Sequence, residues 1–285
     1  MEYIIVTGLS GAGKSQAINS LEDMGVYCVD NMPPSLFLQF SEICTSTMPD
    51  IKRVALVIDS RSKSDFKEML EYINRLKEND NTCKILFLDC DAEVLANRYK
   101  ETRRRHPLLD EASGSAEAAI HKEIELLSLM KEEADFILDT SLMSPILLRE
   151  RVKDLFSGEN DDMLITCLSF GFKYGIPKDA DIVMDIRCLP NPFYIPELKH
   201  KTGLDKEVRD FVMNSKESVE LLEKLWDMIT FLLPNYKSEG KCQLVIAFGC
   251  TGGKHRSVTF AELLNARLKE AGKNTSVYHR DYQRK

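Results

Sequence analysis

The segment GLSGAGKS has the residue types and the spacing of a phosphate-binding loop. It matches the pattern G-x-x-x-x-G-K-[ST] at every defined position, with an apolar run before it and a helix-like stretch after it. The glycines let backbone N–H groups turn around phosphate oxygens, and the lysine reaches the outer phosphates. We therefore predict a nucleotide site, with the Ser15 hydroxyl on Mg²⁺, formed by Gly8, Leu9, Ser10, Gly11, Ala12, Gly13, Lys14 and Ser15.

The second half of such a site is an acidic residue at the end of a neighbouring strand, in contact with the Mg²⁺ shell. Asp59, after RVALVI, is the best-placed candidate, and Asp89, after KILFL, is the alternative. Ser60, Arg61 and Ser62 follow Asp59 directly, and Arg61 is suited to pairing with a phosphate or to capping the next helix. Strand-end aspartates are also common helix caps, so a purely structural role stays open for Asp59.

An arginine-rich segment, YKETRRRHPL, lies where small-molecule P-loop kinases carry a lid. The residues Arg103, Arg104 and Arg105 suit closure over nucleotide phosphates or over a phosphorylated acceptor. A solvated basic turn that ends at Pro107 is the plainer interpretation. A small-molecule kinase is therefore one alternative function, although no acceptor site or catalytic base is evident beside the lid.

A second loop, GCTGGKHRS, has the properties of an anion site. It follows an apolar strand and opens a helix, its glycines free the backbone, and its basic residues bring positive charge to a helix N-terminus. The spacing C-x-x-x-x-x-R, from Cys250 to Arg256, also matches a cysteine phosphatase loop, where a thiolate attacks phosphorus. We rank phosphate binding first, a structural turn second and hydrolysis third, for the residues Cys250, Thr251, Gly252, Gly253, Lys254, His255, Arg256 and Ser257.

The elements that must position both loops alternate between apolar strands and helices. The first half has strand-like runs at 3–8, 26–30, 53–59, 84–90 and 135–140, with helical patterns at about 65–78, 91–104 and 115–133. Strands that are apolar on both faces indicate a parallel sheet covered by helices. A polar segment at 155–163 separates this first half from a second α/β series. In the second series, helical patterns run up to Pro234 and are followed by a strand, a helix and a last strand.

We therefore predict an α/β protein with two domains. A P-loop NTPase-like, kinase-like domain spans 1–156, and a second, smaller α/β domain spans 163–285. Because parallel strands bring their carboxyl ends together, the strand exit that carries Arg187 and Asn191 is expected near the second loop.

Composition limits the partners. The formal net charge is −7, yet residues 241–285 hold nine Lys or Arg against three Asp or Glu, which gives a basic end to an acidic chain. This end favours an anionic partner, and Arg280, Arg284 and Lys285 are the candidates for contacts with RNA. The eight cysteines include no C-x-x-C pair, and no run reaches the length of a membrane span, so we expect free thiols in a cytoplasmic protein without a membrane partner.

Several motifs then follow one another over nearly the whole chain, namely GLSGAGKS, VDNMPPSL, DSRS, ETRRRHPL, SFGFKYGIP, DADIVMDIRCLPNPF, TGLDKEV, GCTGGKHRSV and VYHRD. In this order they resemble the RapZ/YvcJ family of bacterial nucleotide-binding proteins. The resemblance implies an N-terminal domain that binds ATP and GTP and hydrolyses them weakly, with ATP at 8–15 and GTP at 59–62. It also implies a regulatory role and a homo-oligomeric assembly.

For the C-terminal domain, the resemblance implies a sugar-phosphate-binding-like α/β fold with a pocket for a phosphorylated sugar that includes the loop Gly249–Ser257. In one branch of the family this domain senses an amino-sugar phosphate, glucosamine-6-phosphate, binds small regulatory RNA and presents that RNA to a ribonuclease. The tail HRDYQRK keeps part of the basic character of that branch. For that branch, the resemblance implies a histidine after the segment PNP. This chain has Phe193 there, so it departs from the RNA-adapter pattern at this position.

Overall fold

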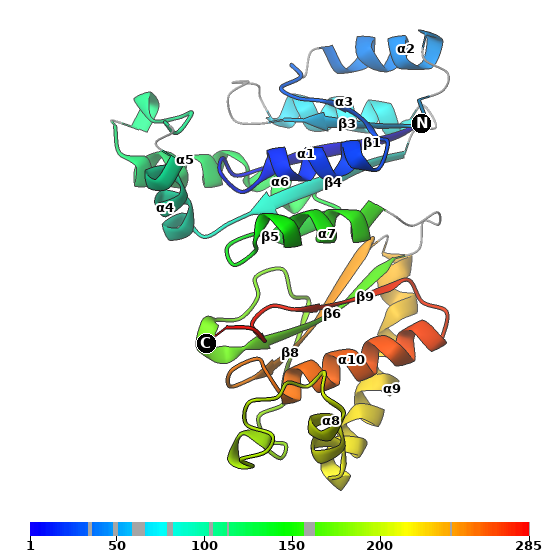
Figure 1. Cartoon of the computed structure of the whole chain (residues 1–285). Helices are drawn as coiled ribbons and strands as arrows, with labels where there is room; N and C mark the ends of the chain where they lie inside the picture. Colours follow the sequence, from blue (N-terminus) through cyan, green and yellow to red (C-terminus); the bar gives the residue numbers. More distant parts are fainter. Residues whose placement is uncertain are drawn as a thin grey trace. The chain divides into compact units, whose positions relative to one another are not determined.

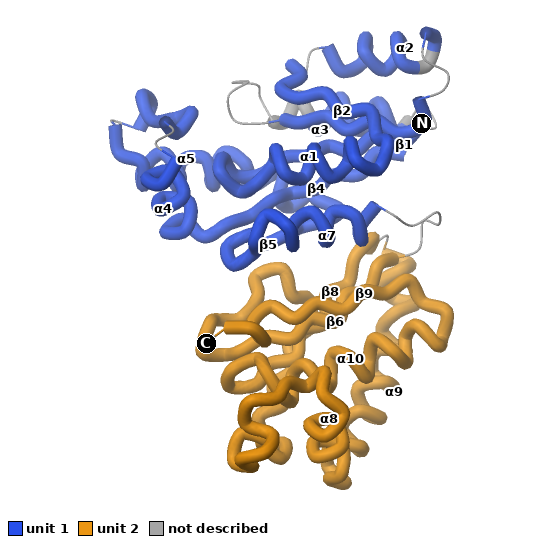
Figure 2. Tube along the Cα trace, viewed as in Figure 1, with its two compact units in different colours: residues 1–157 blue, residues 158–285 orange. Residues whose placement is uncertain are grey.

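The computed structural model describes residues 1–33, 36–47, 51–58, 66–78, 82–102, 105–112, 114–156, 163–239 and 241–284. The chain divides into two compact units, Met1–Ser157 and Gly158–Lys285 (Figure 2). Each unit contains a parallel sheet with its own helices (Figure 1). The predicted α/β class with parallel sheets is therefore confirmed.

Unit 1 is built on five parallel strands in the order β2-β3-β1-β4-β5. The strands are β1 (Glu2–Gly8), β2 (Tyr27–Val29), β3 (Arg53–Val57), β4 (Thr82–Asp89) and β5 (Phe136–Asp139). The helices are α1 (Lys14–Asp23), α2 (Phe37–Thr47), α3 (Phe66–Glu78), α4 (Ala92–Thr102), α5 (Ala116–Leu126), α6 (Ser128–Glu132) and α7 (Pro145–Phe156), with a 3₁₀ turn at Asp110–Ala112. This order places β1, which leads into the first loop, at the centre of the sheet.

The end of β1 explains how the first loop leaves the sheet. Gly8 has φ of +129°, and a Cβ at this position would lie 2.2 Å from the carbonyl oxygen of Leu88 on β4. The backbone of β1 therefore fits against β4 only because residue 8 has no side chain. Directly afterwards the Leu9 N–H donates to the same Leu88 oxygen at 3.0 Å, which fixes the start of the loop.

Unit 2 has four parallel strands in the order β7-β8-β6-β9. They are β6 (Leu164–Gly171), β7 (Ile182–Asp185), β8 (Gln243–Cys250) and β9 (Thr275–His279), and every residue of β6 and β8 is buried. The helices are α8 (Lys206–Met213), α9 (Lys216–Ser238) and α10 (Arg256–Glu270), with 3₁₀ turns at Phe172–Tyr174 and Pro192–Tyr194. A hydrophobic core joins β6 and β8 to all three helices.

Three elements differ from the sequence-based expectations. The pattern at 115–133 forms two helices, α5 and α6, which are separated at the buried Leu127. The predicted strand at 26–30 is shortened to Tyr27–Val29. Helix α9 continues past Pro234 to Ser238, although proline removes one helical hydrogen bond. The buried side chains of Ile229 and Leu233 belong to the core, and this packing offsets the missing bond.

Among the described residues, no helix combines the length and the apolar character that a bilayer crossing requires.

Candidate functional site

The first loop connects the central strand β1 to helix α1 in unit 1, as the sequence predicts for a phosphate loop. The Lys14 ammonium reaches back over this loop, and its Nζ donates to the carbonyl oxygens of Gly8 at 2.6 Å and Leu9 at 3.2 Å. Helix α1 begins at Lys14, so its free N–H groups and its dipole face the loop. This arrangement is suited to holding an anion such as a phosphate group.

A pocket of about 590 Å³ opens at this loop. Its size lies within the range of about 300–1,000 Å³ that is typical of small-molecule sites. The loop forms one wall, and the other walls come from α4, the segment after it and the turn that follows β5. The lining residues outside the loop include Arg98, Tyr99, Arg105, Pro107, Thr140, Met143, Ser144 and Pro145. Cationic and apolar walls together suit a ligand with a phosphate end and a flat organic end.

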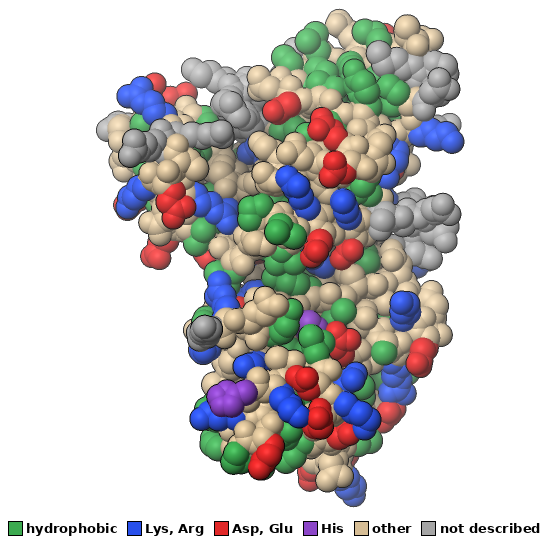
Figure 3. Space-filling model, in the orientation of Figure 1, with side chains coloured by type: hydrophobic (Ala, Val, Ile, Leu, Met, Phe, Trp, Pro, Cys, Tyr) green, Lys and Arg blue, Asp and Glu red, His purple; other side chains and the backbone are tan. Residues whose placement is uncertain are grey.

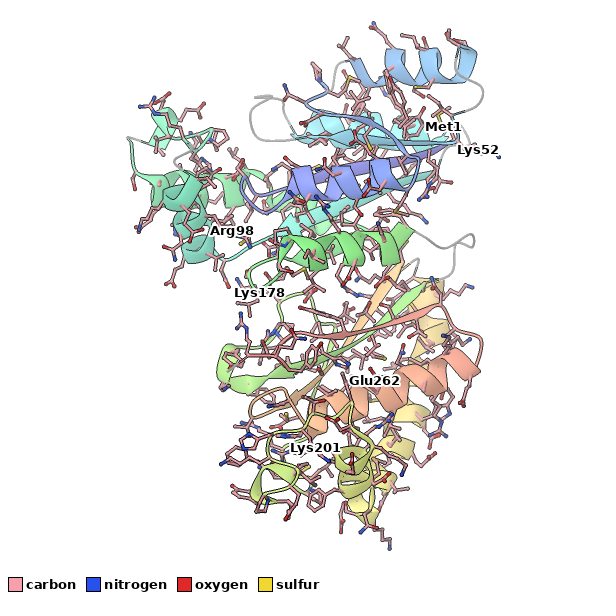
Figure 4. The ribbon with its side chains drawn as sticks, viewed as in Figure 1. Met1, Lys52, Arg98, Lys178, Lys201 and Glu262 are labelled. Carbon is pink, nitrogen blue, oxygen red and sulfur yellow. The ribbon has the colours of Figure 1, made fainter. Side chains whose placement is uncertain are left out.

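Arg98 on α4 joins two parts of this pocket, and it was not among the residues predicted from the sequence. Its Nη1 donates to the Gly11 carbonyl at 3.1 Å, and its Nη2 donates to the Thr140 carbonyl at 2.6 Å (Figure 4 labels Arg98). The available signal was a further arginine one helical turn before the arginine-rich segment. Of that segment, Arg105 lines the pocket, whereas Arg103 and Arg104 lie outside the described residues.

Behind the loop, Ser10 contacts a buried pair of residues that the sequence analysis also missed. The Ser10 N–H and hydroxyl donate to the Glu123 carboxylate at 2.9 and 2.7 Å, and His106 Nε2 lies 3.1 Å from the same carboxylate. Glu123 is fully buried and His106 is 4% exposed. A capping or helix pattern gives no indication of this contact, because Ser10 and Glu123 are far apart in the sequence.

The two aspartates proposed as magnesium contacts have different outcomes. Asp59 lies outside the described residues, together with Ser60, Arg61 and Ser62. Asp89 is buried at the end of β4, where its Oδ2 accepts a hydrogen bond from Lys131 Nζ at 2.8 Å. Its Oδ1 accepts from the N–H of the next residue, Cys90. Asp89 thus has structural partners, and within the described residues no group of three or more His, Cys, Asp or Glu side chains could hold a metal.

The second loop connects β8 to α10 in unit 2. Cys250 is 3% exposed, its Sγ accepts a hydrogen bond from the Gly253 N–H at 3.2 Å, and it lies 3.1 Å from the Ser257 Oγ. These contacts close the loop around the sulfur. The loop also lies against the end of β6, because a Cβ on Gly171 would be 2.6 Å from the Gly252 carbonyl carbon, and one on Gly253 would be 2.6 Å from the Gly171 nitrogen.

Arg256, the arginine of the C-x-x-x-x-x-R spacing, is buried and directed at the backbone. Its Nη1 donates to the carbonyl oxygens of Arg187 at 2.6 Å and Leu189 at 2.9 Å. The strand exit after β7 is therefore held beside the second loop, as parallel topology predicts. Arg187 itself is bound to the Asp185 carboxylate at 2.6 Å and covers the Phe172 ring at 4.2 Å.

His255 and Arg256 each bury an unpaired polar atom at the second loop. Within the described residues, His255 Nε2 and Arg256 Nε have no hydrogen-bond partner, and the two residues are 7% and 4% exposed. Burial lowers the pKa of His255, and the positive charge of Lys254 lowers this pKa further. The imidazole is therefore neutral at pH 7. Buried polar atoms without partners are expected where a ligand or a water completes a site.

The basic tail is less available than its sequence suggests. Arg280 has an 8% exposed side chain, and its Nη2 donates to Asp281 at 2.7 Å and to the Gly175 carbonyl at 2.7 Å. Arg284 is 37% exposed and lies over the Tyr174 ring, 4.9 Å from its centre. Lys285 lies outside the described residues. On the face in view, Lys and Arg side chains of unit 2 are interspersed with Asp and Glu (Figure 3).

A further polar network connects the ends of β6 and β9 to α10. Ser169 Oγ lies 2.9 Å from His279 Nδ1, and His279 Nε2 lies 2.9 Å from Glu262 Oε1 (Figure 4 labels Glu262). The order Ser, His, Glu is that of a hydrolase triad. Ser169 is fully buried, however, so a substrate has no access to its hydroxyl and the network serves the packing of the sheet.

Two family models match the chain. The model described as the RapZ-like N-terminal domain matches residues 1–160, and that of the RapZ C-terminal domain matches residues 163–283. A protein of Caldicellulosiruptor saccharolyticus named "Nucleotide-binding protein" is 51% identical, and the match covers 100% of this chain and 98% of that protein. A protein of Clostridium novyi with the same description is 51% identical, over 99% of this chain and 96% of its own.

Solved structures of kinases match the chain in part. Shikimate kinase from Bacteroides thetaiotaomicron is 17% identical, with a TM-score of 0.38, and the match covers 55% of this chain and 98% of the kinase. A gluconokinase from Sinorhizobium meliloti is 16% identical, with a TM-score of 0.35, over 53% of this chain and 89% of its own. The two domain models and the relatives of 51% sequence identity establish the family. The chain belongs to the RapZ family, with the domains of that family in the same order.

Proposed function

We propose that this chain is a regulatory nucleotide-binding protein that binds ATP and GTP with Mg²⁺ and hydrolyses them weakly. The observation that carries the proposal is the pocket at residues 8–15, where the Lys14 ammonium and the first turn of α1 meet the cationic wall of Arg98 and Arg105. A triphosphate fits the cationic end of this pocket, and the turn that contains Met143 and Pro145 offers an apolar surface for a base. The names of the relatives support the nucleotide-binding part of this proposal.

The assignment of ATP and GTP to separate sites follows the family resemblance. We assign ATP to Gly8–Ser15 and GTP to Asp59–Ser62, with Ser15 and Asp59 in contact with Mg²⁺. Titration calorimetry with MgATP and MgGTP tests both assignments, with Lys14→Ala and Asp59→Asn as the variants. An MgATP affinity that is unchanged in Lys14→Ala contradicts the first assignment, and an unchanged MgGTP affinity in Asp59→Asn contradicts the second.

For the C-terminal domain, residues 163–285, we propose recognition of a phosphorylated sugar at the second loop. The support is a loop that opens the 15-residue helix α10, together with the unpaired buried atoms His255 Nε2 and Arg256 Nε. The test compares glucosamine-6-phosphate with glucosamine, with Lys254→Ala as the variant and Lys269→Ala, at the other end of α10, as its control. Equal binding of the two sugars, or an unaffected Lys254→Ala, contradicts the proposal.

The family resemblance extends this proposal. We propose that the chain binds a small regulatory RNA, that a ribonuclease is a further partner and that the chain forms a homo-oligomer. The exposed part of Arg284 favours it, whereas the internal pairing of Arg280 leaves less basic surface than the sequence suggests. Measurement of RNA affinity against salt concentration tests it, because phosphate contacts produce a steep loss of affinity with salt. Affinity that ignores salt contradicts an RNA role.

Two enzymatic alternatives can be separated from this function. A small-molecule kinase predicts that some acceptor accelerates ATP turnover, which a screen of phosphoryl acceptors measures. A cysteine phosphatase predicts activity that Cys250→Ser abolishes. The geometry disfavours the phosphatase, because the Nη1 of Arg256, which such an enzyme needs for the phosphate oxygens, is bound to the carbonyl oxygens of Arg187 and Leu189.

A further inference from the structure

Glu123 on α5 is a buried carboxylate placed directly behind the first loop. Its Oε1 accepts a hydrogen bond from the Ser10 hydroxyl at 2.7 Å, and its Oε2 accepts from the Ser10 N–H at 2.9 Å. The residue is fully buried, and Ser10 is 7% exposed. A buried carboxylate is costly unless donors satisfy it, so this pair of bonds ties the loop firmly to α5.

His106 gives the same carboxylate a third donor. The Leu108 N–H donates to His106 Nδ1 at 3.2 Å, so the proton of the neutral ring is on Nε2, which lies 3.1 Å from Glu123 Oε2. The His106 ring also packs against Tyr99, with 5.1 Å between ring centres. The histidine is thereby held in one orientation between α4 and α5.

The two partners of Glu123 lead to two different segments of the pocket lining. Ser10 belongs to the loop that surrounds the phosphates, and its N–H points toward Glu123. His106 directly follows Arg105, whose side chain lines the pocket. One carboxylate therefore fixes both the start of the loop and the segment that carries a cationic wall residue.

We propose that Glu123 is a positioning residue of the nucleotide site, which acts on the phosphates through Ser10 and, through His106, on Arg105. This inference rests on the proposed function, namely that residues 8–15 hold the phosphates of a nucleotide. Glu123 orients the loop so that its remaining N–H groups face the ligand, and it keeps the guanidinium of Arg105 at the pocket wall. Partners that orient a binding group contribute to affinity although they do not touch the ligand.

The decisive variant is Glu123→Gln. It keeps the size of the side chain but replaces one acceptor oxygen by an NH₂ donor, so one of the three converging donors loses its partner. The MgATP affinity of the full chain is expected to fall about tenfold, by analogy with other orienting partners. Glu125→Gln makes the same chemical change on the exposed side of α5 and is expected to keep the affinity of the wild type. Thermal melting of each variant verifies that it is folded.

A double-mutant cycle separates positioning from general stabilisation. Ser10→Ala removes the hydroxyl partner, and the loss of MgATP affinity in Ser10→Ala/Glu123→Gln is expected to be smaller than the product of the two single losses. Arg105→Ala combined with Glu123→Gln is expected to show the same coupling. Losses that multiply independently in both cycles overturn the inference.

A second variant keeps the test informative if Glu123→Gln does not fold. His106→Phe retains a ring against Tyr99 and removes the Nε2 donor, and it is expected to weaken MgATP binding in a manner coupled to Arg105→Ala. A His106→Phe variant that binds MgATP as the wild type does overturns the link to Arg105.

Lys14→Ala distinguishes the failure of this inference from the failure of the proposed function. If Lys14→Ala leaves the MgATP affinity unchanged, residues 8–15 are not the phosphate site and both proposals fall. If Lys14→Ala loses affinity while a folded Glu123→Gln keeps it, the nucleotide site stands and the positioning role of Glu123 is overturned.

Discussion

The guanidinium of Arg98 is bonded to the backbone of Gly11, with 3.1 Å between Nη1 and the carbonyl oxygen. The same side chain reaches the carbonyl oxygen of Thr140 through Nη2, so one arginine joins the first loop to the end of β5. The bond to Arg98 fixes the orientation of the Gly11 carbonyl, and with it the shape of a loop whose backbone is suited to face a ligand. Arg98 therefore has a structural role in the loop and lies in the wall of the pocket at the same time.

Arg98→Lys is expected to weaken MgATP binding. Lysine keeps the charge but lacks the planar fork whose two nitrogens reach the Gly11 and Thr140 carbonyls separately, so we expect it to lose at least one of these two bonds. The loss of one or two such hydrogen bonds corresponds to about 1–2 kcal/mol, or about tenfold in affinity. Calorimetric titration measures the change, with Arg75→Lys, exposed on α3, as the control. Equal MgATP affinity in both variants contradicts this role.

Arg280→Ala is expected to destabilise unit 2. The Arg280 side chain is 8% exposed and its partner Asp281 is fully buried, so the substitution leaves a buried carboxylate without its closest cation. Removal of one partner from a buried ion pair costs about 3–5 kcal/mol. Chemical denaturation measures this loss. Arg284→Ala is the comparison: its Nε lies 3.7 Å from the same carboxylate, but its side chain is 37% exposed, so it is expected to lower the unfolding free energy much less. A fully stable Arg280→Ala refutes the ion pair.

The stability of the chain is expected to fall in mild acid because of His255. Its folded-state pKa lies below the ordinary value of about 6.5, first through burial and then through Lys254. Above about pH 6.5, His255 is neutral in the folded and in the unfolded chain, and its contribution to the unfolding free energy is complete. This contribution is lost as the pH falls toward the lowered pKa of the folded state, because the unfolded chain takes up the proton first.

The measurement for His255 is the unfolding free energy from pH 7 to pH 5. His255→Asn is expected to show a shallower decline than the wild type, whereas His200→Asn, at an exposed position near the loop, keeps the decline of the wild type. Parallel curves for the wild type and His255→Asn refute the assignment of this pH dependence to His255.

Cys188 is expected to react with iodoacetamide faster than the other thiols at pH 8. It is the exposed one of eight free cysteines, all of which the structure describes. Burial raises the pKa of Cys28, Cys83 and Cys167 to about 12, so these groups hold almost no reactive thiolate. Mass spectrometry after timed alkylation measures the order of labelling. Fast alkylation that persists in Cys188→Ser would contradict the expectation.

Local patterns sufficed for much of the fold and for part of the candidate site. The continuous apolar runs gave the parallel strands, and a fixed spacing of glycines and Lys14 placed the first loop between β1 and α1. The partners of that loop could not be predicted, because Arg98 and Glu123 reach it across about 90 and 110 residues. Neither residue has a spacing rule that points to the loop, and only the packing of α4 and α5 brings them there.

The end of helix α9 differs from the sequence-based prediction for a related reason. Proline normally ends a helix, but α9 continues to Ser238. Leu233 before the proline belongs to the core, together with residues of β6, β8, α8 and α10, and Tyr236 after the proline packs against that core. The second loop shows the same limit at the level of single atoms. The basic residues were identified from the sequence, whereas the direction of the Arg256 guanidinium, toward Arg187 and Leu189, depends on the course of the strand exit.

The close approach of Gly171 to Gly252 and Gly253 has a consequence for how unit 2 can change by mutation. Each backbone occupies the space that a side chain on the other would need, so neither the exit of β6 nor the loop after β8 accepts a side chain at these glycines while the two backbones lie this close. A transplant of GCTGGKHRS into another parallel sheet would lose its shape unless the strand exit SFG travelled with it. The smallest portable form of this loop is therefore two segments about 80 residues apart, and related sequences are expected to keep glycine in both.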